Sequence, residues 1–366
     1  MSFGRRTARK QTMTGRRTCA RLVFMAAGGS KTASNRFATY AWLVLAYSIL
    51  VILWGTVVRA TGSGAGCGDH WPLCGGRLFP HATQVATVIE FAHRLTSGLV
   101  VLLVAGLVYF AFRRFPARHP ARRYAVGALF FTFTEGLLGA ALVLFGQVGD
   151  NASASRVFLL SLHLVNTFLL LASVTLTAQS ASAAHEAANP VFTLRSPGRG
   201  LYIAYGLGLA GTLMIAVSGT IAALADTLFH ATSLGQAFQW DFSGASPLLR
   251  IRIIHPILAV FIGTFLMILA VHPLFAPAPP GARRIAPALL LLVLFQFGLG
   301  ALNVLLLSPL WIQVLHLLTA DLIWITLVLL SAAVLRHPKR VFALGDPKPG
   351  QIVDAPAVAE RAGFLT

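Results

Sequence analysis

The chain has 366 residues, of which 56% are hydrophobic and 11% are charged. Soluble domains carry about a quarter charged residues, so this composition excludes an ordinary soluble enzyme and predicts an integral membrane protein. The net charge of +18 is distributed between apolar runs, which indicates membrane topology and argues against a nucleic-acid partner.

Eight apolar runs are long enough to cross a lipid bilayer as helices, which takes about 20 residues. They cover residues 37–58, 85–112, 121–146, 157–179, 201–225, 249–275, 285–307 and 310–335. The basic segment 1–36 before them lacks a secretory cleavage pattern. We expect it to be disordered, the first run to be a retained helix, and 336–366 to form a tail.

Basic residues occur in alternate loops of the predicted topology. They are frequent in the N-terminal segment, after the second and sixth runs and in the tail, whereas the other loops hold Asp69, Asp150, Asp226 and Asp241. Cytoplasmic loops of membrane proteins are enriched in Lys and Arg, so both termini are expected in the cytoplasm. The expected location is the bacterial cell membrane, with the mitochondrial inner membrane as the alternative.

The sequence contains a weak internal repeat. EGLLGAALVLFG at 135–146 aligns with QFGLGALNVLLL at 296–307 on the triplet LGA, and LSLHLVNTFLLL at 160–171 aligns with QVLHLLTADLIW at 313–324. Such self-similarity indicates a duplicated structural unit. We therefore predict an all-α membrane fold of two pseudo-symmetric four-helix bundles, over 37–179 and 201–335, joined by a cytoplasmic linker at 180–200.

Four histidines lie inside the apolar runs: His93, His163, His255 and His316. Each lies near the start of an even-numbered run, so all four are expected near the outer membrane surface, two in each half. A single histidine of this kind is usually a core residue. Two imidazoles at matching depth on neighbouring helices, however, are what a bis-histidine haem requires. We predict that the four bind metal as iron ligands of two haems.

Other metal sites fit this pattern less well. A zinc site needs three or four protein ligands. A di-iron carboxylate site needs two Glu-x-x-His motifs and two further glutamates, whereas the chain has one such motif, EFAH at 90–93. Haem is the better interpretation of the histidines.

The stretch TGSGAGCGDHWPLCGG, residues 61–76, follows the first run and faces outward in the predicted topology. Disulfides persist in the periplasm and equivalent compartments, so Cys67 and Cys74 are candidates for one. Three interpretations are open at this point: a disulfide that stiffens the loop, a redox-active pair, or two unpaired thiols.

Glu90 lies three residues before His93 and hence on the same helix face. The matching position in the second half is Arg252, so the halves differ in charge. A carboxylate beside a haem could transfer protons or stabilise developing positive charge; the alternative is a structural ion pair with Arg94. Arg94, Arg250 and Arg252 are candidate partners for haem propionates.

These features resemble the haem A synthase family. The resemblance rests on TGSGAGCGDHWPLCGG, on EFAHRLTSG at 90–98, on the later histidines in even-numbered runs and on the two four-helix halves, and it covers about 37–335. It implies an oxidoreductase that converts the C8 methyl group of haem O to a formyl group, with water as the oxygen source. The product, haem A, serves terminal oxidases.

The family pattern also implies roles for individual residues. His93 and His163 would bind the substrate haem, His255 and His316 would bind a haem B cofactor that accepts electrons, and Glu90 would be the catalytic glutamate. The two cysteines match the outer-loop pair of the family and its disulfide. One departure is that 226–248 has no cysteine pair, where some relatives have a second one.

The resemblance implies several partners: haem O, the lipid bilayer, haem O synthase and cytochrome oxidase assembly factors. The electron acceptor is left open, and a homo-oligomer is compatible with the sequence. Glu135 and Asp321 are further acids inside apolar runs, for which a proton path and a structural hydrogen bond are both open.

Three other functions compete with this interpretation. A dihaem b-type cytochrome that transfers electrons from quinol accounts for the histidines but leaves Glu90 unassigned. A thiol–quinone oxidoreductase would need more than one exchanging cysteine pair. A structural scaffold or haem carrier would form no product.

Overall fold

The computed structural model describes the backbone of residues 11–80, 84–186, 197–243 and 246–335, and the side chains of 35–80, 84–182, 197–242 and 246–335. This part of the chain is helical and contains no named strand. Its helices are α1 (Gln11–Ala60), α2 (Val85–Arg114), α3 (Pro120–Leu144), α4 (Ala154–Glu186), α5 (Arg199–Leu228), α6 (Leu234–Ser243), α7 (Pro247–Arg252), α8 (Ile254–Phe275), α9 (Pro280–Leu305) and α10 (Leu310–Val334), with a 3-10 turn η1 (Ser63–Ala65) after α1.

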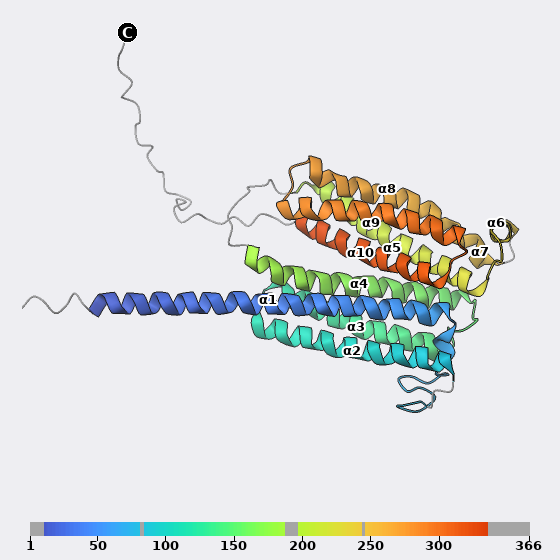
Figure 1. Ribbon diagram of the computed structural model, residues 1–366, viewed down its shortest axis with the longest axis horizontal. Helices are drawn as coiled ribbons and strands as arrows, with labels where there is room; N and C mark the ends of the chain where they lie inside the picture. The colour runs from blue at the N-terminus through green and yellow to red at the C-terminus, as the bar shows by residue number, and fades with distance from the viewer. Residues whose placement is uncertain (1–10, 81–83, 187–196, 244–245, 336–366) are drawn as a thin grey trace, which may run out of the picture.

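Eight helical stretches of the described chain are long and apolar enough to cross a membrane, which confirms the predicted fold class. The first is Asn35–Ala60, the second part of α1. The helix itself begins at Gln11, inside the segment that we expected to be disordered, and its first part extends beyond the other helices (Figure 1).

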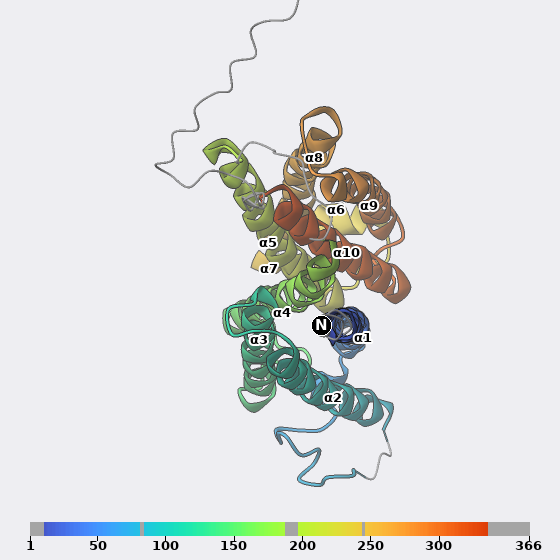
Figure 2. The same ribbon diagram turned by 90° about the vertical axis from the view of Figure 1, so that its left-hand side faces the viewer.

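The long helices lie side by side in one bundle (Figure 1). The loop after α1 lies at the same end of the bundle as α6 and α7, and we call this the loop end. Figure 2 shows two groups of helices: α1–α4, the N-terminal group, and α5–α10, the C-terminal group. The two matched groups explain the internal repeat in the sequence.

The apolar core is divided into clusters, one of which crosses between the groups. One cluster contains residues of α1–α4 together with Trp324, Ile325 and Val328 of α10, and another contains residues of α5, α8, α9 and α10. Trp324 of α10 joins the groups, because its indole Nε1 donates to the carbonyl of Phe168 on α4 at 2.6 Å and the two rings pack edge to face. Large exposed side chains such as Phe133 and Phe261 point away from these cores and suit contact with lipid.

The sixth predicted span, 249–275, is divided between α7 and α8. Pro256 has no N–H to donate to the carbonyl of Arg252, so the regular helical hydrogen bond is missing at this point. α7 starts at Pro247, and the side chain of Ser246 caps it by accepting from the N–H of Leu248 at 3.3 Å. The break lies immediately before His255.

Candidate functional site

Each of the four intramembrane histidines lies within about the first three turns of its span, on α2, α4, α8 and α10. Each imidazole also lies over a glycine of the preceding span. A Cβ added to that glycine would lie 3.2 Å from the ring at Gly55–His93, 3.6 Å at Gly139–His163, 2.9 Å at Gly219–His255 and 3.5 Å at Gly300–His316. Because glycine has no side chain, every ring packs directly against a helix backbone.

His255 and His316 face each other in the C-terminal group. Their ring centroids are 6.3 Å apart, and the ring planes are inclined at 74°. A metal–imidazole bond is about 2.0–2.1 Å long. The two rings are therefore close enough for both imidazoles to bind one metal, which is the ligand set of a bis-histidine haem.

His93 and His163 occupy the matching positions in the N-terminal group and lie near enough to interact electrostatically. Nδ1 of His163 is 3.0 Å from Oε1 of Glu135. The buried Nδ1 of His93 has no hydrogen-bond partner among the described residues. A hydrogen bond at Nδ1, as in His163, leaves Nε2 as the nitrogen that can bind iron.

The ligand chemistry favours haem over a bare metal ion. Within the described ranges, no group of three or more His, Cys, Asp or Glu side chains could hold an ion by itself. Two histidines are too few for a structural zinc site, but they complete the axial ligands of a haem, whose macrocycle supplies the others. The two histidines of each group therefore suit haem ligation better than the binding of a bare ion.

Glu90 is buried, with 3% of its surface exposed. Its Oε2 accepts from the backbone N–H of Cys67 at 2.7 Å, and its Oε1 accepts from Nη2 of Arg94 at 2.5 Å. Nη1 of Arg94 donates to the carbonyls of His70 and Leu73, each at 2.6 Å. The ion pair that the sequence left as an alternative for Glu90 is therefore present, and the hydrogen bonds of its two members to residues 67, 70 and 73 connect α2 to the loop after α1.

A disulfide joins Cys67 to Cys74, as predicted. The loop around it approaches α2 very closely at Gly66, where an added Cβ would lie 2.5 Å from the backbone of Ala86. A side chain at position 66 would push the loop away from α2. The N–H of Cys67 would move with it and lose its hydrogen bond to Glu90.

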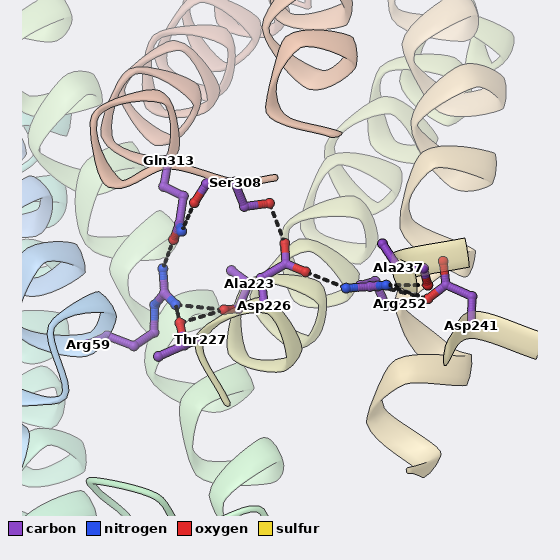
Figure 3. A network of polar contacts seen from close by, with 9 residues as sticks. All are labelled: Arg59, Ala223, Asp226, Thr227, Ala237, Asp241, Arg252, Ser308 and Gln313. Carbon is purple, nitrogen blue, oxygen red and sulfur yellow. Dashed lines mark hydrogen bonds and ion pairs between the residues drawn. The ribbon is translucent and has the colours of Figure 1, made fainter. Parts of the chain in front are cut away.

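Arg252 lies at the position that matches Glu90, and it binds two carboxylates (Figure 3). It donates to Asp241 from Nε at 2.9 Å and from Nη2 at 2.7 Å, and to Asp226 from Nη1 at 2.7 Å. Asp226 also accepts from the hydroxyl of Ser308 at 2.6 Å. The guanidinium charge is therefore balanced by α5 and α6.

The same network reaches the N-terminal group through Arg59, at the end of α1 (Figure 3). Arg59 donates to the carbonyl of Ala223 at 2.8 Å, to the hydroxyl of Thr227 at 2.6 Å and to Oε1 of Gln313 at 2.8 Å. These contacts hold the loop ends of the two groups together.

The three arginines predicted to bind propionates lie in different surroundings. Arg250 is exposed at the loop end, whereas Arg94 and Arg252 bind carboxylates of the chain itself. Propionate binding by these three residues stays a prediction.

Sequence reasoning missed the glycines under the histidines and the hydroxyl of Ser218, which lies 3.1 Å from Nδ1 of His255. The repeat alignment contained part of the signal, because the shared LGA triplets align Gly139 with Gly300, each one span before its histidine. Glu135 was recognised as an intramembrane acid, but its contact with His163 was not predicted.

Comparisons with known proteins identify the family of the chain. Residues 38–328 match the family described as Cytochrome oxidase assembly protein. The chain belongs to this family. Proteins named Heme A synthase are similar to parts of the chain. That of Shouchella clausii is 44% identical over 99 residues, which are 27% of this chain and 33% of the relative. That of Alkalihalophilus pseudofirmus is 36% identical over 113 residues, which are 31% of this chain and 38% of the relative. The predicted resemblance is confirmed.

A longer match comes from a Thermus thermophilus protein named Protoheme IX farnesyltransferase. It is 43% identical over 314 residues, which are 85% of this chain and 50% of that protein. The chain therefore spans about half the length of this curated relative.

Proposed function

We propose that this chain is a haem A synthase that oxidises the C8 methyl group of haem O to a formyl group. Membership of the cytochrome oxidase assembly family and similarity to proteins named Heme A synthase support this proposal. The observation that carries it is the position of Glu90, a buried carboxyl group three residues before His93. Its counterpart in the second group is Arg252, so the two proposed haem sites carry side chains of opposite charge at this position.

In this proposal, His93 and His163 bind the iron of haem O in the N-terminal group. His255 and His316 bind a haem B cofactor in the C-terminal group, where their spacing suits one iron. When bound, haem B would supply a one-electron acceptor. The protein contributes the spacing of the histidines and the apolar surroundings.

Glu90 is the proposed catalytic residue. The N–H of Cys67 and the guanidinium of Arg94 hold its two oxygens, so its orientation is set before the substrate binds. Oxidation of the methyl group makes its carbon electron-poor and open to attack by water. The Glu90 carboxylate can accept a proton from that water or stabilise the positive charge.

The overall reaction balances as R–CH3 + H2O → R–CHO + 4 H+ + 4 e−. It needs an acceptor for four electrons, and one haem iron stores a single electron between its ferric and ferrous states. The electrons therefore leave the C-terminal group for an external acceptor, one electron at a time.

The proposed partners follow from the substrate and the product. Farnesylation of protohaem forms haem O, and the Thermus thermophilus relative with that activity in its name is about twice as long as the region matched here. This supports a partnership with haem O synthase. The product would pass to cytochrome oxidase assembly factors in the bacterial cell membrane, with both termini of the chain in the cytoplasm.

The test is haem analysis of membranes that contain this chain together with a haem O synthase. Haems are extracted with acid and identified by chromatography and mass. We expect haem A with the wild-type chain and none with Glu90→Ala, whereas Asp150→Asn, which removes an exposed acid at the loop end, should retain conversion. Haem B alone in all three would contradict the proposal and favour the dihaem cytochrome.

A further inference from the structure

We propose that Glu135 is a positioning residue that lowers the reduction potential of the haem bound in the N-terminal group, by hydrogen bonding to its ligand His163. Electrons would then move from the N-terminal haem, which has the lower reduction potential, to the C-terminal haem, which has the higher one. This inference rests on the proposed function and assigns Glu135 a role that the proposed chemistry at Glu90 does not include.

Both oxygens of Glu135 are engaged. Oε1 lies 3.0 Å from Nδ1 of His163 and accepts from the hydroxyl of Thr167, while Oε2 accepts from Nδ2 of Asn166 at 2.6 Å. Thr134 donates to the other end of the Asn166 amide at 2.6 Å, which orients its NH2 group toward Glu135. The carboxyl group is therefore fixed beside the imidazole.

The matched position in the C-terminal group is Gln296, which the repeat alignment pairs with Glu135. Its Nε2 donates to the backbone carbonyl of His316 at 3.2 Å, and the buried Nδ1 of His316 has no partner in the described part of the chain. The N-terminal group thus has a carboxylate–imidazole contact, whereas the C-terminal group has a hydrogen bond from an amide to a backbone carbonyl at the matched position.

The second histidine of the C-terminal group has a neutral partner. Nδ1 of His255 lies 3.1 Å from the hydroxyl of Ser218. That hydroxyl donates its own proton to the carbonyl of Ile215 at 2.8 Å, so it acts as the acceptor for the N–H of His255. A hydroxyl is a weaker acceptor than a carboxylate.

This difference determines how strongly each pair donates electrons to iron. A carboxylate that accepts from Nδ1–H makes the imidazole a more basic ligand, and a more basic ligand stabilises the ferric state and lowers the potential. The N-terminal haem then has the lower potential. Oxidation of its methyl group is coupled to an acceptor of higher potential in the C-terminal group.

Optical redox titration of the full-length, haem-loaded chain tests this inference. Glu135→Gln introduces the residue found at 296 and removes the charge while keeping the shape. We expect the N-terminal midpoint to rise, with at least a tenfold change in the ratio of oxidised to reduced haem at fixed potential, which corresponds to about 59 mV. A His93→Ala chain identifies the C-terminal component, which Glu135→Gln should leave unchanged.

Thr167→Val is the matched second variant. It removes a donor that competes for Oε1 of Glu135, so the carboxylate accepts more strongly from His163 and the N-terminal midpoint should fall. If the substitutions acted only by loosening the helices, Glu135→Gln and Thr167→Val would shift the N-terminal midpoint in the same direction, and that result would overturn the proposal. So would an unchanged midpoint in Glu135→Gln. If that variant binds no haem in the N-terminal group, the direction of the Thr167→Val shift decides.

Ser218→Ala is the control in the C-terminal group. It should change the C-terminal midpoint alone, and by less than Glu135→Gln changes the other, because a neutral partner is lost. Haem extraction is carried out on the same membranes. If the wild-type chain forms no haem A while the midpoints of the variants shift as expected, the proposed function is contradicted and this inference stands. Haem A formation by the wild-type chain with unshifted midpoints in the variants would contradict this inference alone.

Discussion

The N-terminal and C-terminal helix groups hold their histidines in the same way, yet opposite charges occupy their matching positions. In the first group the buried acid Glu90 is bound by Arg94 and a loop N–H; in the second, Arg252 is bound by Asp226 and Asp241. Gln296 likewise stands where the first group has Glu135. The duplicated scaffold places a pair of histidines in each group, and the polar residues around the two pairs differ.

The loop end shows the same contrast. In the N-terminal group, the disulfide-containing loop reaches Glu90 directly through the N–H of Cys67. In the C-terminal group, α6 supplies Asp241 as a partner for Arg252. The first arrangement positions a carboxyl group near a histidine, whereas the second neutralises a cation and links helices.

Replacing a histidine in either group should have the largest effect. We expect His93→Ala to remove the haem of the N-terminal group and His255→Ala that of the C-terminal group, because an axial ligand is lost in each case. Haem content per chain, from absorbance and extracted haem, measures this. Loss of both haems from either variant would contradict this expectation, since it would show that haem binding in one group depends on the other group. His272→Ala, at the far end of α8, is the control.

Removing the arginine at the matched position should reduce stability next. Arg252→Gln leaves Asp226 and Asp241 without their cation, and breaking such a largely buried ion pair costs about 3 kcal/mol. Unfolding of the purified chain in denaturant measures this cost. The exposed Arg250→Gln should change stability by less than about 0.5 kcal/mol. Equal effects of the two variants would show that the network contributes nothing specific.

The disulfide should contribute slightly less. Replacing Cys67 and Cys74 together by serine opens a loop closed over a sequence separation of 7, which the chain-entropy estimate values at about 2.5 kcal/mol. Because Cys67 also orients Glu90, we expect slower haem O conversion with an unchanged haem signal from the C-terminal group. Full conversion by the serine variant would mean that the loop orients Glu90 without its disulfide.

Replacing the glycines under the histidines by alanine should have the smallest effect on stability, and the effect should depend on how close the new Cβ lies to the histidine ring. Gly219→Ala places a Cβ 2.9 Å from His255, tighter than ordinary contact, whereas Gly300→Ala places one 3.5 Å from His316. Overpacking should cost the first about 1–2 kcal/mol and disturb the haem spectrum, while the second is tolerated. Gly206→Ala and Gly298→Ala, on the same two helices and with nothing within 4 Å, are the controls. A larger effect of Gly300→Ala would reverse the expected order.

Much of the fold follows from the sequence because its signals are local. Hydropathy over about 20 residues predicts the spans, and the i, i+3 spacing places Glu90 on the helix face of His93. The repeat predicted two matched groups of helices. The break before His255 was missed, although Pro256 provides a signal for it.

Contacts between helices were beyond the sequence, since they depend on how side chains distant along the chain meet. The sequence determined which residues carry charge, which histidines are candidate metal ligands, and where each lies along its span. Only the tertiary structure decided that Arg252 binds Asp226 and Asp241, that Glu135 meets His163, and that four glycines lie under the histidines. The physical reason is that hydropathy and helical period act within one helix, whereas hydrogen bonds and close contacts depend on the rotation and spacing of neighbouring helices.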